Sequence, residues 1–182
     1  MQAENIIAEW IASNDPNKTL SLTNLGMTYL PPLPSNVRYL DVSYNDLTEL
    51  ASLPDSLHFL RATSNKLNII HSLPQRLDSL YISYNNLSYL PELPETLNLL
   101  CADKNMIEYL PHLPDNLEHM YITYNKLTTF PNIPSKLRTV FCFGNPLQPE
   151  CTIDETSTDW YGDGMIFYNH ESKIEALRSL YK

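Results

Sequence analysis

Residues 30–49 read LPPLPSNVRYLDVSYNDLTE, and residues 110–129 read LPHLPDNLEHMYITYNKLTT, which is the same pattern at a later place in the chain. At a period of twenty, the blocks that begin at Leu30, Leu50, Ile70, Leu90, Leu110 and Phe130 align without a gap. Their consensus is L-P-x-L-P-x-x-L-x-x-L-x-V/I/A-x-x-N-x-L-x-x. Repetition at a fixed period of about 20 to 50 residues is typical of solenoids and related architectures. The sequence therefore predicts a stack of six short repeats.

The central part of the consensus, L-x-x-L-x-L-x-x-N-x-L, resembles the leucine-rich repeat. Each repeat then begins with a short strand in which alternate side chains face opposite sides. In the first full repeat, Leu40 and Val42 are expected to face the core, while Tyr39, Asp41 and Ser43 face outward. The asparagine after each strand can bond buried backbone groups in the turn, as a ladder. The predicted ladder consists of Asn45, Asn65, Asn85, Asn105, Asn125 and Asn145.

The return leg corresponds to the L-P-x-L-P part of the consensus, which is unfavourable for a helix because proline fixes φ and lacks an N–H. We expect an extended or polyproline-II-like leg, with its outer core wall made by Leu33, Leu53, Leu73, Leu93, Leu113 and Ile133. The predicted fold class is an α/β-type leucine-rich-repeat solenoid. A curved parallel β-sheet forms its concave side, the extended legs form its convex side, and helical caps close both ends.

The ends of a solenoid need covers, because a terminal repeat would otherwise expose its core. We predict an N-terminal helical cap over residues 1–19, with a helix from about Ala3 to Ser13 whose Ile6, Ile7, Trp10 and Ile11 share one face. Residues 20–149 form the array, with one degenerate repeat before the six. Residues 150–182 form an acidic C-terminal cap with a final helix from about His170 to Tyr181.

The net charge of −9 argues against nucleic acid or an anionic membrane as the partner, since both need clustered Lys and Arg. No stretch reaches the roughly 18 apolar residues of a membrane span. The three cysteines are too few for a disulfide framework or a zinc site, and the five histidines have no metal-binding spacing. We therefore predict a soluble chain with no cofactor, no metal and no catalytic residue. The sequence gives no basis for predicting an oligomer.

The doubled L-P legs, the period of twenty and the closing Gly144-Asn145-Pro146-Leu147 resemble one branch of the superfamily. Residues 19–34, TLSLTNLGMTYLPPLP, are similar to the start of the arrays in that branch. It comprises the leucine-rich-repeat effectors of the IpaH, SspH, SlrP and YopM group, which Gram-negative pathogens deliver into host cells by type III secretion. The resemblance covers roughly residues 3 to 149. It implies a virulence effector, secreted into the host cytoplasm, that binds a host protein.

IpaH-like members of this group also carry a ubiquitin-ligase domain with a catalytic Cys-x-Asp motif after the repeats. The tripeptide Cys101-Ala102-Asp103 has the same letters. However, Cys101 occupies the repeat position of Tyr81 and Tyr121, and Ala102 occupies a core position, so we interpret the match as a coincidence of the repeat. The alternative function is the substrate-recognition part of a longer ligase, whose catalytic part lies outside this chain.

The outward strand positions of the six repeats are rich in aromatic residues. Nine of these twenty-four positions are aromatic, against 10% of the whole chain. Exposed aromatic side chains on a rigid surface are typical of protein-binding sites, although the rings could instead only stack on one another and stiffen the sheet. The predicted partner-binding residues are Tyr39, Asp41, Tyr44, Phe59, Arg61, Tyr81, Tyr84, Asp103, Lys104, His119, Tyr121, Tyr124, Phe141 and Phe143.

The residue before each ladder asparagine alternates with a period of forty. Tyr44, Tyr84 and Tyr124 alternate with residues 64, 104 and 144, which are Ser, Lys and Gly. We hypothesise that the gaps between the tyrosines are slots for side chains of a partner. Descent from a duplicated pair of repeats would also explain the alternation.

Overall fold

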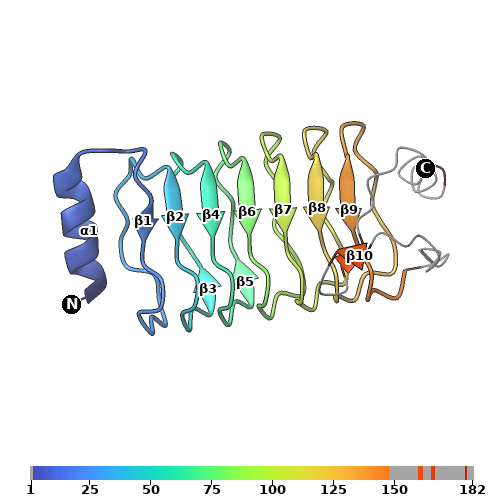
Figure 1. The fold of residues 1–182 in the computed structure, drawn as a ribbon, viewed down its shortest axis with the longest axis horizontal. Helices are drawn as coiled ribbons and strands as arrows, with labels where there is room; N and C mark the ends of the chain where they lie inside the picture. Colours follow the sequence, from blue (N-terminus) through green and yellow to red (C-terminus); the bar gives the residue numbers. More distant parts are fainter. Residues whose placement is uncertain (1, 148–159, 162–164, 167–178, 180–182) are drawn as a thin grey trace.

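Seven short parallel strands, stacked side by side, form the main sheet of the molecule (Figure 1). The structure is a computed structural model and describes residues 2–147, 160–161, 165–166 and 179. Along the main sheet the order is β1 (Leu20–Ser21), β2 (Tyr39–Asp41), β4 (Phe59–Arg61), β6 (Ser79–Tyr81), β7 (Leu99–Cys101), β8 (His119–Tyr121) and β9 (Thr139–Phe141). Successive strands pair in steps of twenty residues, for example Leu40 with Leu60 and Leu60 with Leu80. The predicted leucine-rich-repeat solenoid is confirmed.

The strands alternate between core and surface because side chains on a strand have a period of two. In β2 the central Leu40 is fully buried, while Tyr39 and Asp41 on either side of it are half-buried on the outer face. The same pattern recurs in β6, β7 and β8, and β4 differs only in that its outer residue Arg61 is exposed. We refer to this outer face of the main sheet, predicted above as the concave side, as the sheet face.

The six ladder asparagines connect neighbouring turns of the solenoid through their carboxamides. The Asn85 side chain donates to the carbonyls of Ala62 and Ile82, both at 3.0 Å, and accepts from the Leu67 N–H at 3.0 Å. Each of the other five makes the same three kinds of bond. Backbone groups that a buried bend would leave unpaired are thereby satisfied.

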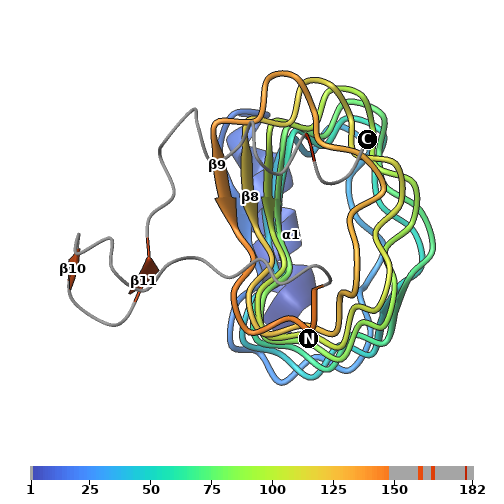
Figure 2. The same ribbon diagram turned by 90° about the vertical axis from the view of Figure 1, so that its right-hand side faces the viewer.

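The return legs run opposite the sheet, as the view along the solenoid shows (Figure 2). No helix occurs in them between residues 20 and 147, as expected from the prolines. The short strands β3 (Glu49–Leu50) and β5 (Ile69–Ile70) pair with each other, and Tyr89 pairs with Tyr109. The proline that ends each L-P-x-L-P segment then accepts a turn bond through its carbonyl, as Pro74 does from the Leu77 N–H at 3.1 Å.

The predicted outer wall of the core is present on these legs. Leu73, Leu93 and Leu113 are buried, whereas Leu33, Leu53 and Ile133 are partly buried against the core. The wall is therefore tightest in the middle of the array, where a repeat has neighbours on both sides.

The predicted N-terminal helix is α1 (Gln2–Ser13), which packs against β1. Ile7 and Trp10 are buried, and the Trp10 indole N–H donates to the Lys18 carbonyl at 2.8 Å. Asn14 ends the helix with φ 51°, a conformation that asparagine tolerates at a C-terminus. The expected burial of Ile11 is wrong, since its side chain is 56% exposed. At 100° per residue the four predicted positions span about 140° of the helix, and Ile11 lies at the edge of that arc.

The predicted acidic C-terminal cap lies largely outside the described residues. Of this part the structure describes Ser179, which is helical, and the antiparallel pair β10 (Trp160–Tyr161) and β11 (Met165–Ile166). The predicted helix from His170 to Tyr181 otherwise falls on residues that are not described. Within the described part of the chain, no helix is long and apolar enough to cross a membrane.

Candidate functional site

The parallel register arranges the fourteen predicted binding residues in four rows across the sheet. The first row contains Tyr39, Phe59 and His119, and the second contains Asp41, Arg61, Tyr81, Tyr121 and Phe141. Asp103 and Phe143 lie just beyond the strands, and the fourth row, in the following turn, contains Tyr44, Tyr84, Lys104 and Tyr124. A single equivalent position in each repeat thus generates each row, because neighbouring strands pair without an offset.

On the sheet face, Arg61 connects the aromatic side chains of the second and third full repeats. Its guanidinium carbon lies 5.5 Å from the centre of the Phe59 ring and 5.0 Å from that of Tyr81. The two rings are tilted against each other at 5.3 Å, and Arg61 also approaches the Asp41 carboxylate at 3.9 Å. The rings therefore pack on one another, as the sheet-stiffening alternative required, while all four side chains keep part of their surface exposed.

Phe141 is an exception to the predicted exposure of this face. Its ring is 1% exposed and stacks on Tyr121 with centres 5.0 Å apart and planes 11° from parallel. Phe141 is therefore part of the buried structure and is not available to a partner. Its strand position predicted an outward ring, and the ring does point that way, but the position alone could not reveal that it is covered.

The small polar residues at the strand ends are also more buried than expected. Ser43 is 1% exposed, Ser83 8% and Thr123 7%, although the alternation of the strand predicted outward side chains. The Ser43 hydroxyl accepts from the Thr63 N–H at 3.2 Å, and the Thr123 hydroxyl donates to the Asp103 carboxylate at 2.7 Å. At this point the chain leaves the strand, so the hydroxyls bond the neighbouring repeat and contribute to the fold.

Cys101 lies between Tyr81 and Tyr121 in the second row and is half-buried. Burial, and after it the nearby Asp103 carboxylate, raises the pKa of the Cys101 thiol to about 12, although the Arg61 charge acts in the opposite direction. Burial also raises the pKa of both flanking tyrosines. Because the thiolate is the nucleophilic form, this raised pKa makes Cys101 a weak nucleophile near neutral pH.

The turn after each strand has a left-handed backbone in every repeat. The seven equivalent residues have φ between 51° and 72°, and they are Asn24, Tyr44, Ser64, Tyr84, Lys104, Tyr124 and Gly144. Glycine and asparagine adopt this conformation readily, whereas for a bulky residue it is an outlier that costs about 1 kcal/mol or more. Tyrosine is therefore not what the turn demands. The three tyrosines are nevertheless 64%, 52% and 53% exposed.

Exposed apolar side chains are concentrated in these turns and in the first residues of the return legs. In the described residues the large hydrophobic side chains with substantial exposure number eight, and seven of them occupy the turn or the first residues of the return leg. We call these seven the tyrosine rim; they are Tyr29, Tyr44, Tyr84, Tyr89, Met106, Tyr109 and Tyr124.

Four members of the tyrosine rim were missed by the sequence analysis, namely Tyr29, Tyr89, Met106 and Tyr109. The three tyrosines among them share one repeat position, at the start of the return leg. That recurrence was a usable signal. The strand pattern does not extend to this position, and exposure on the leg depends on how the chain turns away from the sheet.

The gaps between the turn tyrosines differ from one another. The Lys104 ammonium lies 4.7 Å from the centre of the Tyr84 ring and 5.7 Å from that of Tyr124, so the slot hypothesised there is filled by lysine. Between Tyr44 and Tyr84 the equivalent residue is Ser64, whose short side chain is half-buried. The hypothesis of an open slot therefore stays a prediction for this first gap alone.

Gly144 packs directly against Tyr124, the last tyrosine of the row. A Cβ atom on Gly144 would lie 2.7 Å from the Tyr124 Cδ1 atom and about as close to its backbone, with the nitrogen at 3.1 Å. The Tyr124 ring also meets the Phe143 ring edge to face, with centres 5.2 Å apart. The absence of a side chain at residue 144 therefore allows the two repeats to approach closely.

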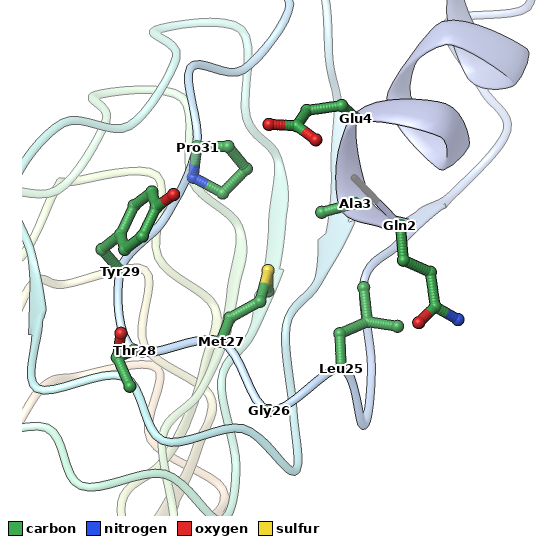
Figure 3. A pocket seen from close by; sticks show the side chains of 9 residues that line it. All are labelled: Gln2, Ala3, Glu4, Leu25, Gly26, Met27, Thr28, Tyr29 and Pro31. Carbon is green, nitrogen blue, oxygen red and sulfur yellow. The ribbon is translucent and has the colours of Figure 1, made fainter.

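A shallow pocket of about 220 Å³ lies where α1 meets the first turn of the array (Figure 3). Met27 and Ala3 point toward each other across it, with Leu25 below and the Tyr29 ring on the far side. None of the predicted binding residues lines this pocket, so it is separate from the sheet face and from the turn tyrosines.

Comparisons with known proteins agree with this geometry. No protein-family model and no curated protein matches the sequence. The chain is similar to a leucine-rich-repeat domain of a Shigella effector, with 32% identity over 80% of this chain and 76% of that domain and a TM-score of 0.69. It is also similar to YopM, a leucine-rich effector from Yersinia pestis, with 28% identity, a TM-score of 0.69 and 80% of this chain covered.

The YopM of Yersinia enterocolitica is 32% identical over 64% of this chain, with a TM-score of 0.54. The chain spans only 48% of the Yersinia pestis YopM and 30% of the Yersinia enterocolitica YopM, but about three quarters of the Shigella domain. The period, the asparagine ladder and the helix-free return legs indicate a leucine-rich-repeat fold. The sequence identity to the Shigella domain, over most of both chains, agrees with that fold. The chain belongs to the leucine-rich-repeat domains of bacterial effectors.

Proposed function

We propose that this chain is a protein-binding module of a bacterial virulence effector, and that it recognises a host protein through the sheet face and the tyrosine rim. The observation that carries the proposal is the row of Tyr44, Tyr84 and Tyr124, exposed at 52–64% on a left-handed turn that does not favour tyrosine. The effector names of its structural relatives support delivery into the host cytoplasm by type III secretion.

The physical basis is a rigid surface that presents amphipathic rings. Tyrosine offers a large contact area and a hydroxyl, and because it has few rotatable bonds it loses little conformational entropy on binding. It is also enriched among the residues that contribute most to the binding energy of interfaces. The backbone that holds the rings is secured on both sides by the asparagine ladder and by parallel pairing. Little ordering is therefore needed on binding, which favours affinity.

A comparison of two variants in a host-cell lysate tests the proposal. In the first, Tyr44, Tyr84 and Tyr124 are changed to Asn, which tolerates the left-handed turn and removes the rings. In the second, the matched control, the exposed return-leg residues Arg76, Glu92 and Glu95 are changed to Ala. We expect one or more host proteins to be enriched by the wild type and by the control and lost from the tyrosine variant, with affinities then measured on the purified partner. Equal capture by all three proteins contradicts the proposal.

A second candidate is the substrate-recognition part of a longer ubiquitin ligase. Two observations favour it. The similar Shigella structure is described as one domain of an effector, and the chain carries the doubled L-P legs. Ubiquitin discharge from a charged conjugating enzyme, measured with the product of the complete gene, separates the two. Discharge that persists after Cys101→Ala but requires a cysteine beyond residue 182 supports the ligase, and no discharge at all supports the stand-alone module.

A further inference from the structure

The row formed by Tyr44, Tyr84 and Tyr124, here called the tyrosine row, has a constant interval. The strands that precede these tyrosines are β2, β6 and β8, and exactly one strand, β4 or β7, separates each from the next. Neighbouring strands are about 4.8 Å apart, so the tyrosines recur about every 9.6 Å. A partner that contacts each ring in the same way needs a repeat of that length.

Regular peptide conformations differ enough in their repeats to be distinguished. A polyproline-II helix repeats every three residues at about 3.1 Å per residue, or about 9.3 Å. A β-strand returns to the same face at about 6.7 Å and again at about 13.4 Å, neither of which fits. An α-helix returns to the same face after seven residues, at about 10.5 Å, and would be out of step by nearly 2 Å after two intervals. The polyproline-II repeat fits the tyrosine row best.

The chemistry of the row agrees with this conformation. The backbone of a polyproline-II helix makes no internal hydrogen bonds, so its carbonyls are free to accept from tyrosine hydroxyls. Proline rings pack between aromatic side chains in known modes of proline-rich recognition. In the gap between Tyr44 and Tyr84 only the short, half-buried Ser64 lies beneath, which leaves room for a pyrrolidine ring.

The second gap selects for charge. Lys104 lies over both Tyr84 and Tyr124, and in the described part of the chain no carboxylate oxygen is within 4.0 Å of its ammonium. Lys66, two repeats earlier, is by contrast paired with Asp46 at 2.8 Å. The uncompensated cation in the middle of the tyrosine row is therefore complementary to an acidic side chain of the partner.

The geometry points to an acidic, proline-rich segment in polyproline-II conformation as the ligand of the tyrosine row. A proline occupies the gap between Tyr44 and Tyr84, and an Asp or Glu three residues away pairs with Lys104. This inference rests on the proposed protein-binding function and names the class of partner segment for it.

Fluorescence anisotropy with the complete chain and three labelled peptides tests the inference. The probe consists of four Pro-Pro-Glu repeats. Four Pro-Pro-Gln repeats keep the conformation without the charge, and four Gly-Gly-Glu repeats keep the charge without the conformation. We expect the Pro-Pro-Glu peptide to bind about tenfold more tightly than the Gly-Gly-Glu peptide, because its conformation is already ordered. It should bind about fivefold more tightly than the Pro-Pro-Gln peptide, because of Lys104.

Matched protein variants assign the binding to the tyrosine row. Tyr84→Asn keeps a residue that tolerates the left-handed turn and should weaken Pro-Pro-Glu binding about tenfold. Lys104→Gln should remove the preference for Glu over Gln and leave Pro-Pro-Gln binding unchanged. Glu92→Asn is the control, since Glu92 is exposed on a return leg outside the tyrosine rim, and it should have no effect. Circular dichroism and unfolding midpoints verify that each variant is folded.

Equal affinity for the Pro-Pro-Glu and Gly-Gly-Glu peptides overturns the inference, as does unchanged binding by Tyr84→Asn. If none of the peptides binds while a host protein still depends on the turn tyrosines, the partner class is wrong and the protein-binding function stands. If neither the peptides nor any host protein distinguishes the tyrosine variant from the control, both proposals fail.

Discussion

Two adjacent residues of each repeat, the ladder asparagine and the residue before it, are present for different physical reasons. Asn85 is needed by the fold, because its carboxamide bonds three backbone groups of two neighbouring turns. Tyr84, just before it, has φ 59° and projects its ring into solvent, where Asn24 and Gly144 show that smaller residues suffice. This contrast between a residue that the fold needs and one that the backbone disfavours is the basis of the proposed binding role of Tyr84.

Replacement of Asn85 by Ala removes all three of these bonds. The Ala62 and Ile82 carbonyls keep bonds from Asn65 and Asn105, whereas the Leu67 N–H loses its acceptor inside the solenoid. We therefore expect the free energy of unfolding to fall by about 2 to 3 kcal/mol. Asn86, the next residue, is exposed, and Asn86→Ala should change stability by less than about 0.5 kcal/mol. Urea unfolding of both variants gives the comparison, and a similar loss in the two would contradict the role assigned to Asn85.

The thiol of Cys101 gives a prediction about pH. Its pKa is raised to about 12 in the folded chain, mainly by burial, against about 8.5 for an unfolded cysteine. The folded state therefore keeps a proton that the unfolded state loses, and the free energy of unfolding should decrease as the pH rises from about 8.5 towards 12. At pH 8, alkylation followed by peptide mass spectrometry should find Cys101 unreactive in the native chain and reactive in urea. Rapid native alkylation would show that the thiol is ionised after all.

At the scale of the element, each repeat consists of a strand, a left-handed turn and an extended leg. The turn must satisfy two conditions. Its backbone must bend sharply, and the strands of adjacent repeats must stay in register. Residues there can vary widely in side chain, from Gly144 to Tyr124, as long as neighbouring repeats do not collide. The variable turn is therefore where a solenoid can acquire binding chemistry without changing its core.

Gly26 and Gly144 both have a left-handed backbone but differ in their surroundings. Substitutions at the two positions can therefore distinguish backbone strain from steric conflict. Gly26 has φ 63° with no atom within 4 Å of an added Cβ, whereas on Gly144 that atom would lie 2.7 Å from the Tyr124 ring. Gly26→Ala should lower stability by about 1 kcal/mol through strain alone. Gly144→Ala should lower it by a further 1 kcal/mol or so, since the Tyr124 backbone is also close and cannot easily move. Thermal or urea unfolding measures both, and equal losses would contradict the conflict with Tyr124.

At the scale of the whole molecule, stability depends on contacts between neighbouring repeats and on a cover at the end. The core is a continuous column of leucines from Leu20 to Leu147, and α1 closes its N-terminal end through Ile7 and Trp10. In such an array the energy is close to a sum over repeats and their interfaces. Damage at the cap should therefore spread inward from that end.

Trp10→Ala tests this view of the cap. Trp10 is 4% exposed and its indole donates to the Lys18 carbonyl, so truncation should lower the free energy of unfolding by about 3 to 5 kcal/mol. Hydrogen exchange should accelerate most in β1 and progressively less toward β9. Ile11→Ala, at a position 56% exposed, is the control and should change little. Uniform acceleration along the array would indicate that the molecule unfolds as a single unit instead.

The fold was largely predictable because it repeats. A period of twenty, strand positions such as Leu40 and the ladder asparagines are local features, and six copies in register confirm one another. Exposure was less predictable. The prediction from the sequence placed Ser43, Phe141 and Tyr44 alike on the outward side, yet two of them are buried and one is 64% exposed.

The sequence by itself determined the solenoid, its register and the helix-free return legs, because these depend on apolar spacing and proline geometry within each repeat. Tertiary structure alone decided which outward positions remain accessible. The packing of one repeat on the next buries Ser43, places Lys104 between Tyr84 and Tyr124, and brings the leg tyrosines to the same edge as the turn tyrosines. Contacts between repeats set exposure, and they depend on side-chain sizes twenty residues away.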